Sequence, residues 1–469
     1  MDLVRIGEPA IVLSTPEAAI ELLEKRGNIY SSRPRSVFAG EVAYRSAKGA
    51  LLPMGTQLRR FRTLMTASLG TVPSKNFRPL EDPETRLMLR DLLQEPNPAK
   101  YRGHMQRSVH SVAFCTAYGQ RIDRLGAEHL EFYNSVERFF VRFSSLPGVR
   151  LVDHLPILSK IPLVSRWFCG EAEEQGDKEE RFFRSCMDQA KSAYVNGNAI
   201  RASSWFAMER QERFGYTELE LALLSGAPYA AGVTTTLGSC ETFLLAILLH
   251  PHVLERAQKE IDTVVGPERL PDFRDFDTLP YIRAMIKETL RWHPFTPLGI
   301  AHATTEDDVY EGMFIPAGST VMANIYAITR NTEVKIFLAA LSIPTNRSFS
   351  SFPTPKNTSP SVFLNTTDPL VKNYNMTFGF GRRICPGQHV ATDQLFIMMS
   401  RILWAFDVKP MKGGPKLTEI HARHGFFGPP VPFPYELVPR SDRVRSLIME
   451  QAALAEEDVR AWKTLDYDL

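Results

Sequence analysis

The sequence has few of the features that define a secreted, a zinc-binding or a nucleic-acid-binding protein. It contains only five cysteines in 469 residues, scattered and without a Cys-x-x-Cys pair: Cys115, Cys169, Cys186, Cys240 and Cys385. This number and spacing argue against a disulfide framework or a cysteine zinc site and favour a reducing compartment. The formal net charge is only +2, so no charge imbalance predicts binding to nucleic acid.

A long apolar run is also missing from the beginning of the chain. Residues 1–23 carry Asp2, Arg5, Glu8, Glu17 and Glu21, which is typical of neither a signal peptide nor a membrane span. No repeat is present and no linker appears before the last third, while 44% hydrophobic residues is the composition of a globular protein. We therefore expect one large catalytic domain over residues 1–469, opening with a short strand pair.

The stretch from Phe378 to Gly387 places a single cysteine in a glycine-rich loop beside two arginines, just before an apolar run over 389–406. Its glycines permit positive φ and the close approach of a flat ligand, and Pro386 suits the first position of a helix. Backbone N–H groups and a helix N-terminus favour a thiolate at Cys385, and Arg383 would hold an acidic group of the ligand. The alternative is a structural cysteine at a loop–helix junction.

The pattern Phe-x-x-Gly-x-Arg-x-Cys-x-Gly in this loop resembles the haem-binding loop of the cytochrome P450 family. The resemblance implies a mainly α fold with a small β region and a long central helix over haem b. It implies that Cys385 is the axial iron ligand, because a thiolate favours O–O cleavage, and that Arg383 pairs with a haem propionate. The remaining haem-loop residues that the resemblance implies are Phe378, Gly379, Gly381 and Gly387.

Residues 217–250 predict the central helix. A capping box, Thr217-x-x-Glu220, precedes a largely apolar run, which gives a helix about 50 Å long with a kink near Pro228.

Within this helix, Ala231-Gly232-Val233-Thr234-Thr235-Thr236 resembles the family pattern Ala/Gly-Gly-x-acid-Thr-Thr. The resemblance implies that Ala231 and Gly232 let the helix pass close over the haem, and that Thr235 holds dioxygen and water for proton delivery. Thr234 stands in the place of the acid. A hydroxyl cannot replenish protons as a carboxylate does, so we expect slower turnover with leakage to peroxide, or a route through water. A purely structural role of these hydroxyls is the alternative.

Two further basic residues match family positions on the haem propionates. Arg62 lies in a basic helix that opens at Gly55, although Leu58 stands where the family has a tryptophan. His302 falls where similar proteins place a histidine or an arginine. The alternatives are a solvated basic face for Arg62, where Arg59 and Arg60 would dock an acidic redox partner, and a surface histidine for His302.

Residues 282–291 predict a helix on which Glu288 and Arg291 lie three apart and form a structural pair. In the family, a downstream Pro-Glu-Arg-Phe strip adds a second arginine to this pair. Here residues 335–370 are rich in Ser, Thr, Pro and Asn instead, with Arg347 as the one weak candidate. This composition predicts a loop or a disordered insert, and we hypothesise an altered segment. Residues 441–469 predict a polar helical C-terminal tail, and residues 312–325 a hairpin around Pro316-Ala317-Gly318.

The segment from His293 to Tyr310 resembles fungal secondary-metabolism members of the family. This implies a haem-thiolate monooxygenase that oxidises an apolar terpenoid or polyketide-like substrate with O2 and electrons from NADPH, delivered by NADPH-cytochrome P450 reductase. Pro297 to Ile300 and residues 425–428 would line the substrate pocket. Two rivals stay open: a non-oxygenating haem-thiolate isomerase or dehydratase, and an inactive haem-binding pseudoenzyme.

The apolar, proline-broken residues 151–168 would lie near the substrate entrance and touch a membrane, with ordinary core packing as the alternative. Because residues 1–23 predict no transmembrane anchor, we expect either a shortened chain or attachment by other surfaces, on the cytoplasmic side and peripherally at the endoplasmic reticulum.

Overall fold

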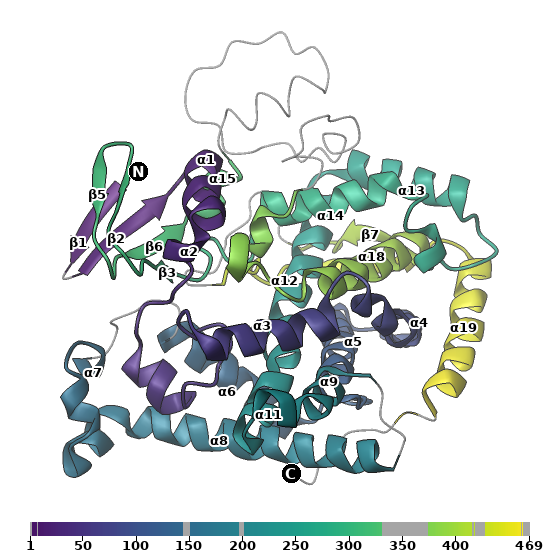
Figure 1. The fold of residues 1–469 in the computed structure, drawn as a ribbon. Helices are drawn as coiled ribbons and strands as arrows, with labels where there is room; N and C mark the ends of the chain where they lie inside the picture. The colour runs from purple at the N-terminus through teal and green to yellow at the C-terminus, as the bar shows by residue number, and fades with distance from the viewer. Residues whose placement is uncertain are drawn as a thin grey trace, which may run out of the picture.

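The computed structural model describes residues 2–6, 8–143, 151–196, 201–330, 374–414, 417, 427–460 and 462. Helices make up most of the described chain, and a small sheet lies at one side of them, close to the N-terminus (Figure 1). The expected fold class, mainly α with a small β region, is confirmed. The atypical segment 335–370 lies outside the described residues, and the single-domain assignment for 1–469 stays a prediction.

The main sheet joins the beginning of the chain to its later half. Strands β1 (Asp2–Ile6) and β2 (Glu8–Leu13) form the predicted antiparallel pair. Strand β2 then pairs in parallel with β6 (Thr320–Ala323), which pairs antiparallel with β3 (His302–Ala303). This order places His302 on an outer strand of the sheet, where the segment around Ser32 adds a bridge to Ala303.

The predicted hairpin around residues 316–318 is wrong. The turn lies instead at Glu311 and Gly312, both with positive φ, between β4 (Asp308–Tyr310) and β5 (Met313–Ile315). Strand β6 pairs instead with β2, so it belongs to the main sheet. Strand β2 comes from the beginning of the chain. A local turn signal cannot reveal such a distant partner.

The core surrounds α12 (Ala227–Leu249), which packs against α5 (Tyr101–Tyr118) and α18 (Gln388–Ala405). Most of the second half of α12 and residues 393–405 of α18 are buried, so both helices lie in the core. Cys240 Sγ of α12 lies 3.9 Å from Met398 Sδ of α18. The helix that follows the Cys385 loop is thereby packed directly on the central helix.

The predicted single central helix is divided in two. The capping box is present, with Thr217 Oγ1 accepting from the backbone N of Glu220 and the Glu220 carboxylate accepting in return. Helix α11 (Glu218–Ser225) ends at Gly226, and Pro228 lies in the first turn of α12. A Cβ at Gly226 would lie 2.6 Å from the Tyr118 hydroxyl oxygen. The contact with Tyr118 therefore leaves no room for a side chain at position 226. Pro228 alone had predicted only a kink within one helix.

The stretch Glu218–Leu249 is also long and apolar enough to cross a membrane, judged by length and composition alone, and 72% of its most apolar window is buried inside the protein. The core position of α11 and α12 accounts for that composition.

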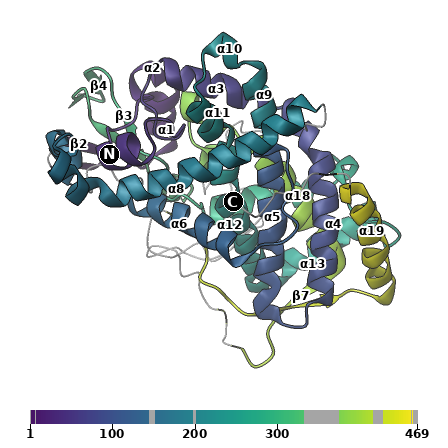
Figure 2. The ribbon, with the colours of Figure 1, turned by 90° about the horizontal axis from the view of Figure 1, so that it is seen from below.

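Two helices run along the outer side of α12. Helix α6 (Ala127–Phe143) packs on both α12 and α8 (Pro162–Val195), and α8 crosses the molecule as seen from below (Figure 2). At the opposite edge, α19 (Asp442–Arg460) packs an apolar row on α4 (Arg78–Gln94). The predicted helix in the C-terminal tail is confirmed as far as residue 460.

The remaining elements are α1 (Pro16–Ala19), η1 (Ile20–Lys25), α2 (Gly27–Tyr30), η2 (Val37–Ala43), α3 (Thr56–Leu69), η3 (Pro73–Phe77), η4 (Pro98–Lys100), α7 (Leu151–His154), η5 (Pro156–Ser159), α9 (Ser203–Glu209), α10 (Gln211–Phe214), α13 (Pro251–Val264), η6 (Phe273–Asp275), α14 (Pro280–Trp292), α15 (Ile325–Ile328), η8 (Met376–Phe378), η9 (Gly381–Arg383), β7 (Phe406–Pro410) and β8 (Tyr435–Pro439).

Candidate active site

The Cys385 loop folds back on itself immediately before α18. The backbone N of Cys385 donates to the Phe378 carbonyl at 2.7 Å, and the N–H groups of Gly387 and Gln388 are directed at the Cys385 sulfur. Burial raises the pKa of the Cys385 thiol above its ordinary value, and these N–H groups and Arg62 oppose the rise only in part. Burial thus opposes the thiolate that these N–H groups and Arg62 favour. A coordinated metal ion deprotonates such a thiol outright.

The three loop glycines have different roles. Gly379 and Gly381 have positive φ, 87° and 51°, as predicted, but a Cβ on Gly381 would lie 2.4 Å from the carbonyl oxygen of Leu23. Gly381 is thus required for packing on η1 rather than for a ligand. Gly387 has φ −88°, so it does not use the positive φ that glycine permits, and a Cβ there would meet nothing within 4 Å. Helix α18 starts at Gln388, so Pro386 precedes the helix instead of opening it.

Arginines from distant parts of the chain meet at this loop. Arg62 of α3 donates to the Ile384 carbonyl at 2.6 Å, next to Cys385. Arg383 donates to the carbonyls of Ser31 and Leu52 at 2.6 and 2.5 Å. Burial and the nearby Arg62 lower the pKa of Arg383 to about 10. Arg62 and Arg383 therefore lie at one site, as the sequence predicted.

Arg33 belongs to the same group and was missed by the sequence analysis, which assigned its segment no role. It is 8% exposed and donates to the carbonyls of Ala50, Ile300 and Ala301 at 2.9, 2.8 and 2.7 Å. Burial, followed by the charge of Arg383, lowers the pKa of Arg33. No local signal distinguishes this arginine, because its importance comes from partners far along the chain.

His302 is buried in β3 and is not a surface histidine. Its Nδ1 lies 2.8 Å from the Tyr30 carbonyl oxygen, so Nδ1 carries the proton. Burial, and then Arg33, lower the pKa of His302 well below its usual value. The ring is therefore neutral, and its Nε2 can donate to an anion only after taking up a proton.

These residues fit an anionic, flat cofactor. Within the described residues, the hydrogen bonds of Arg33, Arg62 and Arg383 all go to backbone carbonyl oxygens. Buried like charges held together in this way stabilise a bound anion. The two carboxylates of a haem beside a cysteine sulfur supply the chemistry that this set of donors needs.

The α12 face was only partly anticipated. Ala231 is exposed and Thr235 is half-buried, and Thr235 Oγ1 donates to the Ala231 carbonyl at 2.9 Å. A Cβ on Gly232 would lie 3.7 Å from Cβ of Ala113, so this glycine faces α5. Ala231 and Thr235, one turn apart, form the open face, and the expected role of Gly232 at the cofactor stays a prediction.

Thr234 lies next to a carboxylate in the folded protein. Its Oγ1 donates to Oε2 of Glu137 on α6 at 2.9 Å and lies 3.0 Å from the Tyr133 hydroxyl. The sequence analysis missed Glu137, since a residue nearly one hundred positions upstream gives no signal in the helix motif. Position 234 of α12 lacks the acid of the family pattern, but the folded protein places the Glu137 carboxylate beside it.

The structural pair is confirmed. Arg291 Nε and Nη2 lie 2.7 and 2.8 Å from the two carboxylate oxygens of Glu288, and Nη1 donates to the Thr329 carbonyl at 3.1 Å. Both side chains are buried. Burial alone would lower the pKa of Arg291, but the Glu288 carboxylate outweighs it and raises that pKa. Arg347, the weak candidate for a second arginine, lies outside the described residues.

The proposed redox docking face is altered. Arg60 is engaged by the Glu220 carboxylate at 3.1 Å and stacks on Tyr216, whereas Arg59 is exposed. Of this pair, only Arg59 presents its charge to solvent.

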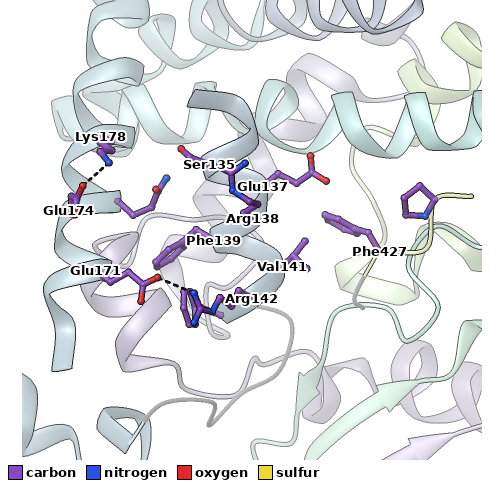
Figure 3. A pocket seen from close by; sticks show the side chains of 13 residues that line it. Ser135, Glu137, Arg138, Phe139, Val141, Arg142, Glu171, Glu174, Lys178 and Phe427 are labelled. Carbon is purple, nitrogen blue, oxygen red and sulfur yellow. Dashed lines mark hydrogen bonds and ion pairs between the residues drawn. The ribbon is translucent and has the colours of Figure 1, made fainter. Parts of the chain in front are cut away.

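A cavity of about 600 Å³ opens on the outer side of α6 (Figure 3). It is lined by α6, α8 and the segment at Phe427 and Pro429, and neither Cys385 nor Thr235 lines it. Phe427 packs on Phe295, with ring centroids 4.9 Å apart. Because this cavity includes neither Cys385 nor residues 297–300, the expectation that residues 297–300 and 425–428 line the substrate pocket stays a prediction. Residues 418–426 lie outside the described residues.

The sequence profile of the family described as Cytochrome P450 matches residues 2–437. The chain belongs to the cytochrome P450 family. It is similar to Cytochrome P450 monooxygenase 253 of Postia placenta, with 31% identity over 94% of this chain and 82% of that protein. It is also similar to Cytochrome P450 monooxygenase ARMGADRAFT_1018420 of Armillaria gallica, with 30% identity over 96% of this chain and 85% of that protein.

Among solved structures, a zebra fish cytochrome P450 in complex with abiraterone shares the fold. Its TM-score is 0.72 and its identity 20%, over 94% of this chain and 96% of that one. The protein is thus a P450 oxidoreductase of the monooxygenase type, and its cofactor is haem held through a cysteine thiolate.

Proposed function

We propose that this P450 oxidises an apolar secondary metabolite, terpenoid or polyketide-like, using O2 and electrons from NADPH delivered by NADPH-cytochrome P450 reductase. The observation that carries the proposal is the Cys385 sulfur, which receives two backbone N–H groups and lies next to Arg62. When bound there, a thiolate-ligated haem supplies the redox chemistry that activates O2.

The other residues of the site would bind the cofactor and stabilise the surrounding core. Cys385 would hold the iron, with Phe378, Gly379 and Gly387 forming its loop. Arg33, Arg62 and Arg383 would hold the propionates, and His302 would join them only with a protonated Nε2. The buried pair of Glu288 and Arg291 stabilises the core at α14. Gly381 lets the Cys385 loop pack closely on η1.

On α12, Ala231 and Thr235 present the face above the cofactor. Thr235 would hold a water or hydroxyl group in position for proton transfer, while Thr234 points to α6. A Cβ on Gly232 would make only an ordinary van der Waals contact with α5, so Gly232 would serve the close passage of α12 over the cofactor.

An apolar substrate is supported by the aromatic surroundings of the segment from Pro297 to Ile300. Phe427 packs between Phe295 and Phe140, and the Gly428 N–H donates to the Phe295 carbonyl at 2.8 Å. Clustered aromatic side chains of this kind favour the burial of apolar ligand surface.

Peripheral membrane contact is supported by an exposed apolar group at α7, η5 and the start of α8. Trp167 is 90% exposed and Leu163 is 87% exposed, beside Leu155, Ile157 and Ile161. Large apolar patches of this kind mark interaction sites, and the neighbouring tryptophan suits a membrane interface. We expect Leu163→Ser with Trp167→Ser to weaken sedimentation with phosphatidylcholine vesicles several-fold. The exposed Leu454→Ser on α19 is the control, and equal losses in both variants would refute the contact.

The reduced, CO-bound absorption spectrum tests the centre of the proposal. We expect a Soret band shifted far to the red for the purified chain, lost in Cys385→Ala and kept in Cys169→Ala, a buried cysteine elsewhere. A Cys385→Ala variant with an unchanged spectrum would disprove the ligand assignment. Absence of haem in the wild type would favour the pseudoenzyme, and a thiolate spectrum without reductase-dependent O2 consumption would favour the isomerase or dehydratase.

A further inference from the structure

We propose that Glu137 on α6, acting through Thr234, is the proton-relay carboxylate that α12 itself lacks. This inference rests on the proposed monooxygenase function and names a residue that passes protons from solvent to the Thr235 side of α12. The expected leakage to peroxide from a missing acid then does not apply to the folded protein.

The hydrogen-bond directions around Thr234 are fixed by counting donors. Its single hydroxyl proton goes to Glu137 Oε2 at 2.9 Å, because a carboxylate only accepts. The Tyr133 hydroxyl, 3.0 Å from Thr234 Oγ1, must then donate to it. The backbone N of Thr234 donates in turn to the Tyr133 oxygen at 3.3 Å.

Tyr133 is held in place from its other side. It is 3% exposed, and its ring packs edge-on against His110 at a centroid distance of 4.6 Å. Burial raises the pKa of Tyr133 above its usual value, so it stays a protonated donor. The Thr234 hydroxyl is therefore oriented toward Glu137 and not toward the interior of the helix bundle.

Glu137 also lines the solvent-open cavity formed by α6, α8 and the segment at Phe427, and Figure 3 shows its side chain on the side of α6 that faces Phe427. The charged groups that line the same cavity are Arg138 and Arg142 on α6 and Glu171, Glu174 and Lys178 on α8. Glu174 lies 2.7 Å from Lys178, and Glu171 lies 3.5 Å from Arg142. Both acids on α8 are thus engaged by cations, while the Glu137 carboxylate is bonded to the Thr234 hydroxyl.

This position gives Glu137 access to water on one side and to α12 on the other. In the transfer, the carboxylate takes one proton from hydronium in the cavity, which leaves as water. The Thr234 hydroxyl then turns away from Glu137 Oε2, and the protonated carboxyl group donates its proton to Thr234 Oγ1. The original hydroxyl proton of Thr234 passes to a water molecule on the Thr235 side. One proton enters, one leaves, and neither residue keeps a charge that it did not have at the start. A carboxylate near an exposed cavity is suited to repeat this step at each turnover.

The competing role is a simple tie between α6 and α12. Glu137→Gln separates the two, because the amide oxygen still accepts from Thr234 but the side chain no longer carries a proton. The matched control is Glu174→Gln, which removes an acid from the same cavity that bonds to α8 only.

We expect Glu137→Gln to keep the thiolate CO spectrum and to raise the ratio of peroxide to product about tenfold or more. The pH dependence of coupling should flatten, and Thr234→Asp in the Glu137→Gln background should restore at least half of the coupling. Glu174→Gln should match the wild type. Independently of turnover, the infrared carboxylate band lost in Glu137→Gln should shift in Thr234→Val of the resting protein.

A wild-type ratio and pH profile in Glu137→Gln would overturn the relay while leaving the proposed function intact. A raised ratio without rescue by Thr234→Asp, or with an unchanged pH profile, would also overturn it and favour the structural tie. An infrared band insensitive to Thr234→Val would show that the contact is absent in solution. Wild-type protein that consumes no O2 with reductase and NADPH would overturn the proposed function, and the relay with it.

Discussion

Removal of one partner from the buried pair on α14 should be among the most destabilising single changes in the protein. Glu288 and Arg291 share two charge-assisted hydrogen bonds of 2.7 and 2.8 Å, and they are 4% and 6% exposed. Glu288→Ala leaves the guanidinium buried, and among the described residues its remaining hydrogen bond goes to the Thr329 carbonyl at 3.1 Å. An unpaired buried charge of this kind costs about 3–5 kcal/mol.

The assay is urea unfolding of the haem-loaded protein, followed by circular dichroism and by the Soret band. The control is Glu268→Ala, which breaks an exposed pair with Arg443, where the side chains are 70% and 50% exposed; we expect about 0–1 kcal/mol there. A double variant, Glu288→Leu with Arg291→Met, should recover most of the lost stability. Equal losses for Glu288→Ala and Glu268→Ala would refute the reasoning.

Three further predictions follow from single contacts. Gly381→Ala should cost about 2 kcal/mol or more and lower haem content, because φ is +51° and the new Cβ meets a carbonyl of η1, whereas Gly387→Ala should leave apoprotein unfolding nearly unchanged. Burial lowers the pKa of His293 from 6.5 to about 4, so stability is complete above pH 6.5 and falls toward pH 4 by at most about 3 kcal/mol; His293→Gln should flatten this pH dependence in urea titrations. In the wild-type background, Thr234→Asp should not improve the yield of product per NADPH, because the new carboxylate would lie against Glu137; a clear improvement would contradict the contact.

Local signals in the sequence were sufficient for the parts of the site that lie within one segment. The Cys385 loop, the capping box at Thr217 and the Glu288–Arg291 pair each depend on residues a few positions apart, and the structure contains all three. The fold class followed from the same family pattern, since the motif and the apolar central helix occur together.

The parts that failed depend on contacts between distant segments. Gly226, where the central helix is divided, lies against the Tyr118 side chain, and Gly381 is required by a carbonyl on η1. Arg33 and Glu137 acquire their places only when α6, the main sheet and the Cys385 loop assemble. A sequence motif reports which residue is missing from a helix, but it does not report which neighbour replaces it.

The arginine contacts at the Cys385 loop have a consequence for the order of synthesis. Arg62 and the carbonyls of Ser31 and Leu52 belong to the first part of the chain, yet their partners lie 322 to 352 residues later. At about 5–20 residues per second, the early residues wait on the order of tens of seconds for the loop to leave the ribosome. The cofactor site thus closes late, so haem insertion is expected to be a post-translational step and a nascent chain stalled before Cys385 should retain none.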